Sequence, residues 1–145
     1  MLVSFSDAPE RTRGRTLKPL KVFLVEDSPL IRERLRESLD ATGRIEVVGH
    51  ADSEHGATAA LSGTPWDALV LDLRLREGTG IGVLRALAHD GHASGKKVIV
   101  YTNYALPRLR DQCTKLGADH VLDKGADYDR LRDLLEAMAD GQPDA

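Results

Sequence analysis

The sequence has little cysteine, no long apolar run and no excess of one charge sign, and each absence argues against a class of protein. Cys113 is the only cysteine, which rules out an intrachain disulfide and a zinc cluster built from thiolates. No window approaches the roughly 18 apolar residues of a membrane span, and the first residues lack an apolar stretch of signal-peptide length. The 20 basic residues are spread among 23 acidic ones, which does not favour nucleic acid as a partner. We therefore expect a cytoplasmic protein.

The length and patterning of the chain predict one domain with short extensions. At 145 residues the chain can bury a single core and is too short for a second domain of ordinary size. Residues 1–19 show no hydrophobic period and carry four basic residues against two acidic ones, so we expect a flexible amino-terminal arm. The domain is predicted over residues 20–140. Residues 141–145 are expected to form a short tail, so no DNA-binding domain is predicted in the chain.

Five apolar runs alternate with amphipathic stretches in this region, a pattern typical of repeated βα units and a parallel sheet. The first helix should begin at Ser28 and Pro29, because serine caps helices and proline is tolerated at the first helical position. Cys113 shares a helical face with Leu106 and Leu109, which predicts a place in the core. The predicted strands are Lys21–Val25, Ile45–His50, Asp67–Leu71, Lys97–Tyr101 and Asp119–Leu122. The later helices are predicted at Glu54–Leu61, Gly80–His89, Leu106–Leu116 and Asp127–Ala139.

Polar side chains stand at the carboxyl ends of four predicted strands. They are Glu26 and Asp27 after the first strand, Asp72 after the third, Thr102 after the fourth and Lys124 after the fifth. Because ligands of open α/β sheets sit outside this edge, we expect these groups to meet there. Three carboxylates repel one another, and a bound Mg²⁺ relieves the repulsion while preferring oxygen ligands. One carboxylate can then attack a phosphoryl group while the metal and the lysine neutralise charge.

These residues, in this order and at these spacings, resemble the receiver domain of two-component response regulators. The resemblance covers about residues 20–140 and includes Gly80, eight residues after Asp72. It implies an α/β, flavodoxin-like (βα)5 fold, in which a five-stranded parallel sheet of order 2-1-3-4-5 carries helices on both faces. It also implies a stand-alone response regulator, which accepts a phosphoryl group and is not a turnover enzyme.

The resemblance assigns a role to each site residue. Asp72 accepts the phosphoryl group from a histidine kinase or a histidine phosphotransfer protein. Thr102 hydrogen-bonds that group and moves inward, and Lys124 pairs with its oxygens. The implied Mg²⁺ ligands are Glu26 through water, Asp27, Asp72 and the backbone carbonyl of Arg74. Phosphorylation then changes binding to an unidentified downstream protein. We expect a monomer or weak homodimer that binds no membrane.

Several positions depart from the usual receiver pattern. Arg76 stands four residues after Asp72, where receivers often carry proline. Val121 stands where receivers usually carry the aromatic ring that rotates with the threonine, and His120 or Tyr104 is a candidate to replace it. Arg74 and Tyr104 are bulky residues at positions that govern the access of water to the acyl phosphate. We therefore predict slow self-dephosphorylation.

Other functions stay open on the sequence alone. The same site serves a phosphate relay or sink, and a pseudo-receiver binds partners without phosphorylation. A haloacid-dehalogenase-like phosphatase or a topoisomerase-primase-like domain typically needs a second acid two residues after the first, where Arg74 stands after Asp72. A flavodoxin needs a first loop that cradles the phosphate of a flavin, and Glu26 with Asp27 would repel that phosphate.

Overall fold

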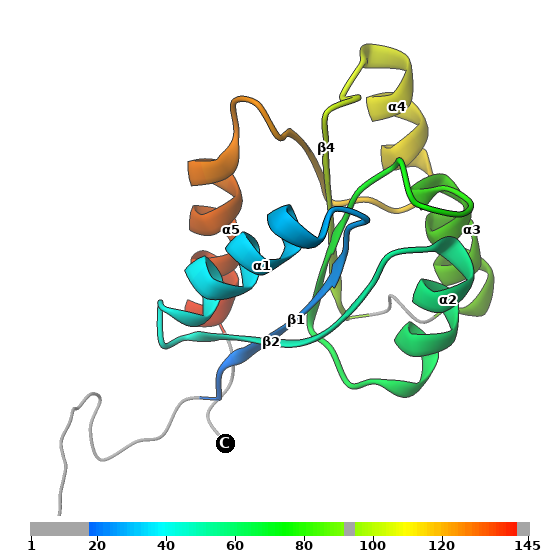
Figure 1. The fold of residues 1–145 in the computed structure, drawn as a ribbon. Coiled ribbons are helices and arrows are strands. Elements are labelled where there is room, and N and C mark those ends of the chain that lie inside the picture. Colours follow the sequence, from blue (N-terminus) through cyan, green and yellow to red (C-terminus); the bar gives the residue numbers. More distant parts are fainter. Residues whose placement is uncertain (1–17, 92–94, 142–145) are drawn as a thin grey trace, which may run out of the picture.

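In the computed structural model, a parallel sheet lies between two layers of helices (Figure 1). The structure describes residues 18–91 and 95–141, so the predicted arm and tail lie almost wholly outside the described residues. The strands are β1 (Leu20–Val25), β2 (Ile45–Ala51), β3 (Ala68–Leu71), β4 (Lys97–Thr102) and β5 (His120–Asp123). The helices are α1 (Pro29–Asp40), α2 (Glu54–Gly63), α3 (Gly80–Asp90), α4 (Pro107–Lys115) and α5 (Tyr128–Asp140).

The sheet has the order β2-β1-β3-β4-β5, and all neighbouring strands run parallel. The α/β fold and the strand order implied by the resemblance are confirmed. Helices α1 and α5 cover one face, and α2, α3 and α4 cover the other (Figure 1). This arrangement leaves the carboxyl ends of the strands uncovered, which is where an open α/β sheet binds its ligands.

The core forms two separate layers because successive side chains of a strand point to opposite faces of the sheet. In β1, Val22 and Leu24 pack toward α1 and α5, whereas Phe23 and Val25 pack toward α2, α3 and α4. All four side chains are buried. A strand that is covered on both faces reads as a continuous apolar run, and this explains the run at the start of the domain.

Hydroxyl groups cap α1, α2 and α3. Ser28 accepts a hydrogen bond from the backbone N–H of Ile31 at the start of α1. Ser53 and Thr79 cap α2 and α3 in the same way. The predicted start of α1 at Ser28 and Pro29 is confirmed. The caps fix where each loop joins its helix, and so they restrict the conformations of the loops that carry the polar residues.

The ends of the strands differ from the predictions by single residues. Thr102 is the last residue of β4 and does not follow the strand. Asp67 and Asp119 lie just before β3 and β5, where the Asp67 carboxylate accepts the N–H of Lys21 and the Asp119 carboxylate that of Val98, each at 2.8 Å. Their side chains therefore bond to a neighbouring strand at the end opposite the site.

The prediction for the fourth helix was right for Cys113 and wrong for Leu106. Cys113 is fully buried, whereas Leu106 is 61% exposed. Leu106 is the residue before α4 and has an extended backbone, so helical spacing does not place its side chain on the inner face. Leu109, inside the helix, packs against the core as expected. Burial raises the pKa of the Cys113 thiol, which keeps it neutral.

Candidate functional site

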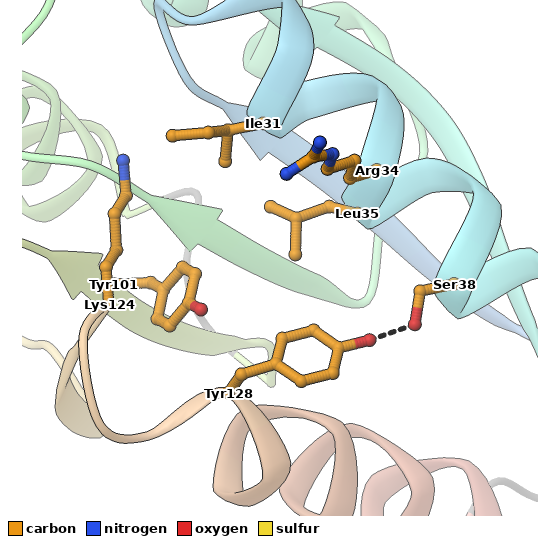
Figure 2. A pocket seen from close by; sticks show the side chains of 7 residues that line it. All are labelled: Ile31, Arg34, Leu35, Ser38, Tyr101, Lys124 and Tyr128. Carbon is orange, nitrogen blue, oxygen red and sulfur yellow. Dashed lines mark hydrogen bonds between the residues drawn. The ribbon is translucent and has the colours of Figure 1, made fainter.

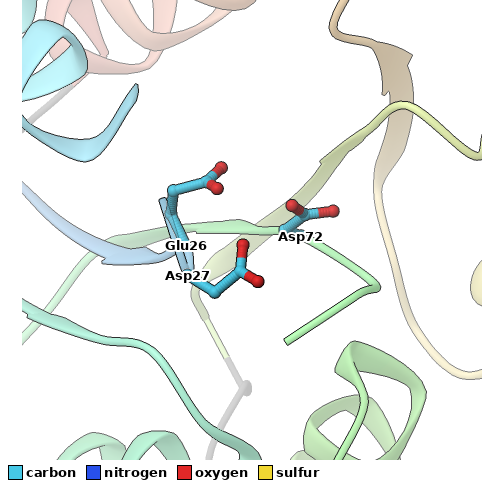
Figure 3. Close-up of side chains that lie close together, drawn as sticks. All are labelled: Glu26, Asp27 and Asp72. Atoms are coloured by element: carbon cyan, nitrogen blue, oxygen red, sulfur yellow. The ribbon is translucent and has the colours of Figure 1, made fainter. Parts of the chain in front are cut away.

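Three carboxylates from two neighbouring strands meet at the uncovered edge of the sheet. Glu26 and Asp27 follow β1, and Asp72 follows β3, which pairs with β1. One oxygen from each carboxylate lies within 4.8 Å of the other two. Figure 3 shows the three groups around a common space, with Asp72 across from the other two. The structure thus brings together the acids that the sequence singled out.

Lys124 joins this cluster from the end of β5. Its Nζ lies 2.5 Å from Oε1 of Glu26 and 2.7 Å from Oδ2 of Asp72. The side chains are 9%, 4% and 7% exposed for Lys124, Glu26 and Asp72. If all four groups are ionised, the three acids and the lysine carry two net negative charges, which one divalent cation balances. Carboxylate oxygens at this density suit a small hard cation, and the residues fit Mg²⁺.

The ion pairs alter how readily these groups ionise. Burial raises the pKa of Glu26, and the hydrogen bond from Lys124 offsets only part of this rise. Burial alone would lower the pKa of Lys124, but its hydrogen bonds to Asp72 and Glu26 outweigh this effect and raise its pKa. Lys124 is therefore held as a cation, whereas the charge on Glu26 is unfavourable without further compensation.

Backbone contacts hold Asp72 firmly. Its Oδ1 accepts hydrogen bonds from the N–H groups of Leu73 at 2.7 Å and Arg74 at 3.4 Å. Its own N–H donates to the carbonyl of Val25, which continues the pairing of β3 with β1. Gly80 lies against this turn, and a Cβ at that position would collide with the Asp72 carbonyl oxygen. A glycine is needed there for α3 to approach the turn at Asp72 so closely.

The loop between β3 and α3 is fixed by charged contacts from the β2–α2 connection. Arg76 makes two hydrogen bonds of 3.1 Å to the carboxylate of Asp52, and its N–H donates to the Asp52 carbonyl. The Glu54 carboxylate accepts the N–H of Thr79 at 2.9 Å. The hydrogen bond from Arg76 lowers the pKa of Asp52. The structure therefore gives an alternative support for a loop that lacks the usual proline at position 76.

Thr102 is fully buried, but it does not contact the acids in this structure. Its Oγ1 accepts the N–H of Tyr104 at 3.2 Å, and its carbonyl accepts the N–H of Lys124 at 3.0 Å. Within the described residues, no hydrogen bond joins the Thr102 side chain to Asp72 or to Lys124. The oxygen of this hydroxyl already accepts one hydrogen bond, and its own hydrogen is the group that could donate to a phosphoryl oxygen.

The side chains of Arg74 and Tyr104 contact each other. The guanidinium hydrogen-bonds to the tyrosine hydroxyl and lies 5.3 Å from the centre of the ring. The backbone of Arg74 also bridges to Thr79, and the direction of its carbonyl toward the acids stays a prediction. Val121 and His120 are both partly buried in β5. The candidates for a replacement of the aromatic switch thus stay untested.

Comparisons with known proteins agree with this geometry. The family described as "Response regulator receiver domain" matches residues 22–136, and the chain belongs to this family. The Escherichia coli nitrate/nitrite response regulator protein NarP is 29% identical over 123 residues, which are 85% of this chain and 56% of NarP. The Mycobacterium tuberculosis activator DevR/DosR is 41% identical over 68 residues, or 47% of this chain and 31% of DevR/DosR.

Solved structures support the same fold. The receiver domain of the putative response regulator NarL from Mycobacterium tuberculosis has a TM-score of 0.76 and 24% identity, over 86% of this chain and 99% of that chain. A LuxR-family regulator from Aurantimonas sp. SI85-9A1 has a TM-score of 0.75 and 25% identity, over 86% of this chain and 88% of that one. The protein is thus a receiver domain of two-component signalling, and members of this family bind Mg²⁺ at an acidic pocket.

Membership of the receiver-domain family excludes the phosphatase, topoisomerase-primase and flavodoxin alternatives. The chain covers only 56% to 60% of the length of NarP and of two similar regulators from Bacillus subtilis and Haemophilus influenzae. Activities that those proteins owe to regions outside the receiver domain are therefore not assigned to this chain. Among the described residues, no helix combines the length and apolar character needed to cross a membrane.

We predict that Glu26→Gln raises the midpoint of thermal unfolding in a chelator at neutral pH, by roughly 3 °C. The unfolded chain ionises Glu26 near its ordinary pKa of 4.5, and the folded chain only at higher pH, so ionisation of Glu26 costs stability as pH rises through that interval. The gain should therefore disappear in acid below that value. Differential scanning calorimetry measures it, with Glu46→Gln, on exposed β2 surface, as the control. A lower midpoint for Glu26→Gln would contradict the prediction.

Proposed function

We propose that this protein is a phosphorylation switch, in which a histidine kinase or a histidine phosphotransfer protein transfers a phosphoryl group to Asp72 in a Mg²⁺-dependent reaction. The observation that carries the proposal is the buried contact of Lys124 with Asp72 and Glu26, next to Asp27. Such a contact places a cation where the charge of the transferred group develops. A purely structural ion pair does not need the third carboxylate.

The chemistry assigned to Asp72 is a nucleophilic displacement. One carboxylate oxygen forms a bond to phosphorus while the bond from phosphorus to the donor's imidazole nitrogen breaks. The electron pair stays on that nitrogen, and the product is an acyl phosphate on the protein. Bound Mg²⁺ would supply charge neutralisation for the phosphoryl oxygens. The residues proposed to hold it are Glu26 through water, Asp27, Asp72 and the backbone carbonyl of Arg74.

Lys124 and Thr102 are proposed to form hydrogen bonds to the phosphoryl group. Lys124 moves its hydrogen bond from the Asp72 carboxylate to a phosphoryl oxygen, which needs little displacement because Nζ is already 2.7 Å from Oδ2. The Thr102 hydroxyl donates its hydrogen to a phosphoryl oxygen and moves inward, which weakens the hydrogen bond that its oxygen accepts from the Tyr104 N–H. Since Tyr104 lies in the connection to α4, this movement would alter the surface near α4 and change the affinity for a downstream protein. The protein is proposed to act in the cytoplasm as a monomer or weak homodimer and as a phosphoacceptor without turnover of its own.

We predict that the intact protein gains the mass of one phosphoryl group on incubation with a small acyl-phosphate donor and Mg²⁺. The gain should be lost in chelator, because repulsion among the acids is then not relieved, and lost in Asp72→Ala, because the nucleophile is absent. Intact-protein mass spectrometry measures the change. Asp111→Ala removes an exposed carboxylate on α4 and should leave the gain intact.

No gain in the native chain would contradict the switch and favour the pseudo-receiver, which binds partners without phosphorylation. A gain combined with identical partner binding before and after would favour a phosphate relay or sink. Circular dichroism of Asp72→Ala distinguishes loss of the acceptor from loss of the fold.

We predict that replacing Arg74 and Tyr104 together by alanine shortens the half-life of the acyl phosphate, by about threefold or more. The backbone N–H of Arg74 bonds to the Asp72 carboxylate, and removal of the bonded pair of side chains would open a path for water to the phosphorus. The half-life is measured by loss of the phosphoryl mass after the donor is removed. Leu106→Ala, which shortens an exposed side chain nearby in sequence, is the control. An unchanged half-life in the double variant would remove this explanation.

A further inference from the structure

A pocket of about 390 Å³ lies between α1 on one side and the ends of β4 and α5 on the other. Ile31, Leu35 and Ser38 line it from α1, Tyr101 from β4 and Tyr128 from α5. Figure 2 shows the α1 side chains reaching toward the two tyrosine rings. The volume lies within the range of roughly 300–1,000 Å³ that is usual for sites of small organic ligands.

The interior of the pocket is mainly apolar, and a hydrogen bond between two hydroxyl groups closes it at one end. The hydroxyl of Tyr128 hydrogen-bonds to that of Ser38 at one end (Figure 2). Burial raises the pKa of the Tyr101 phenol, so its ring stays neutral. Two aromatic rings and two aliphatic side chains therefore offer a surface that suits the flat or aliphatic body of a small molecule.

Arg34 brings a positive charge to the pocket. Its side chain lines the pocket on the solvent side of α1. Within residues 18–91 and 95–141, no hydrogen bond or ion pair reaches its guanidinium. Arg36 on the same helix, by contrast, lies 3.9 Å from the Glu33 carboxylate. The second cation at the pocket, Lys124, points its ammonium away from the tyrosines toward Asp72 and Glu26 (Figure 2).

We propose that this pocket binds a small organic carboxylate, whose apolar body lies against Leu35, Tyr101 and Tyr128 and whose carboxylate pairs with Arg34. Charge complementarity selects an anion, because a free guanidinium forms charge-assisted, often bidentate hydrogen bonds with a carboxylate. The apolar walls select against hydrated inorganic anions, which would leave that surface uncovered.

The ligand is also coupled to the phosphoryl site. The stem of Lys124 lines the pocket while its ammonium contacts Asp72, and Tyr101 directly precedes Thr102. A ligand that shifts either side chain changes the affinity of the acceptor site, and by linkage phosphorylation changes the affinity for the ligand. This coupling rests on the proposed function, whereas ligand binding itself does not.

Binding is tested by nuclear magnetic resonance titration of the labelled protein in chelator, with benzoate and hexanoate as probes and their neutral amides as controls. We expect saturable shifts for residues around the pocket with dissociation constants on the order of a millimolar for the acids, and weaker binding of the amides. Arg34→Gln should weaken binding of the acids by about three- to tenfold and leave the amides unchanged. Arg36→Gln should bind all four compounds as the native chain does.

Three results would overturn the proposal. The first is the absence of saturable shifts at the pocket with either acid. The second is equal affinity of an acid for native protein and Arg34→Gln. The third is shifts at α1 and α5 that depend on protein concentration without any probe, because a second copy then covers the pocket. Phosphorylation is measured separately, as the gain in protein mass with and without benzoate. If the protein binds benzoate but never gains a phosphoryl group, the proposed switch is refuted and the proposed ligand site is not.

Discussion

The ammonium group of Lys124 lies between the carboxylates of Glu26 and Asp72, and the arrangement of the site depends on this contact. Moving an ion out of water costs on the order of several kcal/mol, which only close partners repay. One lysine cannot compensate three acids, and burial raises the pKa of Glu26 by more than its contact with Lys124 lowers it. The remaining negative charge is the physical basis for the proposed binding of a divalent cation and for the proposed transfer of a phosphoryl group that depends on this cation. The same imbalance limits the stability of the metal-free protein.

The residues around this charge cluster hold the strand ends and the adjoining loop in position. Two apolar layers hold the sheet, so the ends of β1, β3 and β5 are fixed relative to one another. Gly80 brings α3 close to the acceptor turn, and Asp52 with Arg76 ties the adjoining loop to the neighbouring connection. Functional sites commonly contain groups that cost stability, such as the buried acids here, and the surrounding fold must compensate for that cost.

Local patterns in the sequence were enough to predict a parallel sheet and the site acids, and the resemblance to receiver domains implied the strand order. Neither predicted the contacts between distant side chains. Glu26, Asp27, Asp72 and Lys124 could be placed together because the carboxyl ends of parallel strands meet at one edge. Leu106 was misplaced because the helix starts one residue later, where spacing rules do not yet apply. The pairing of Arg76 with Asp52 joins residues 24 positions apart, and no sequence period marks it. The pocket between α1 and α5 likewise exists only after the helices pack.

The most direct test of this account is to locate the acyl phosphate in the chain. Borohydride reduces an aspartyl phosphate to homoserine, and peptide mass spectrometry then identifies the altered position. After incubation with a small acyl-phosphate donor and Mg²⁺, the account predicts homoserine at position 72 and unchanged aspartate at position 27. Of these two aspartates in the described chain, Asp72 has Lys124 within hydrogen-bond distance of its carboxylate and Asp27 does not. Homoserine at position 27, or a phosphoryl group that resists borohydride, would contradict it.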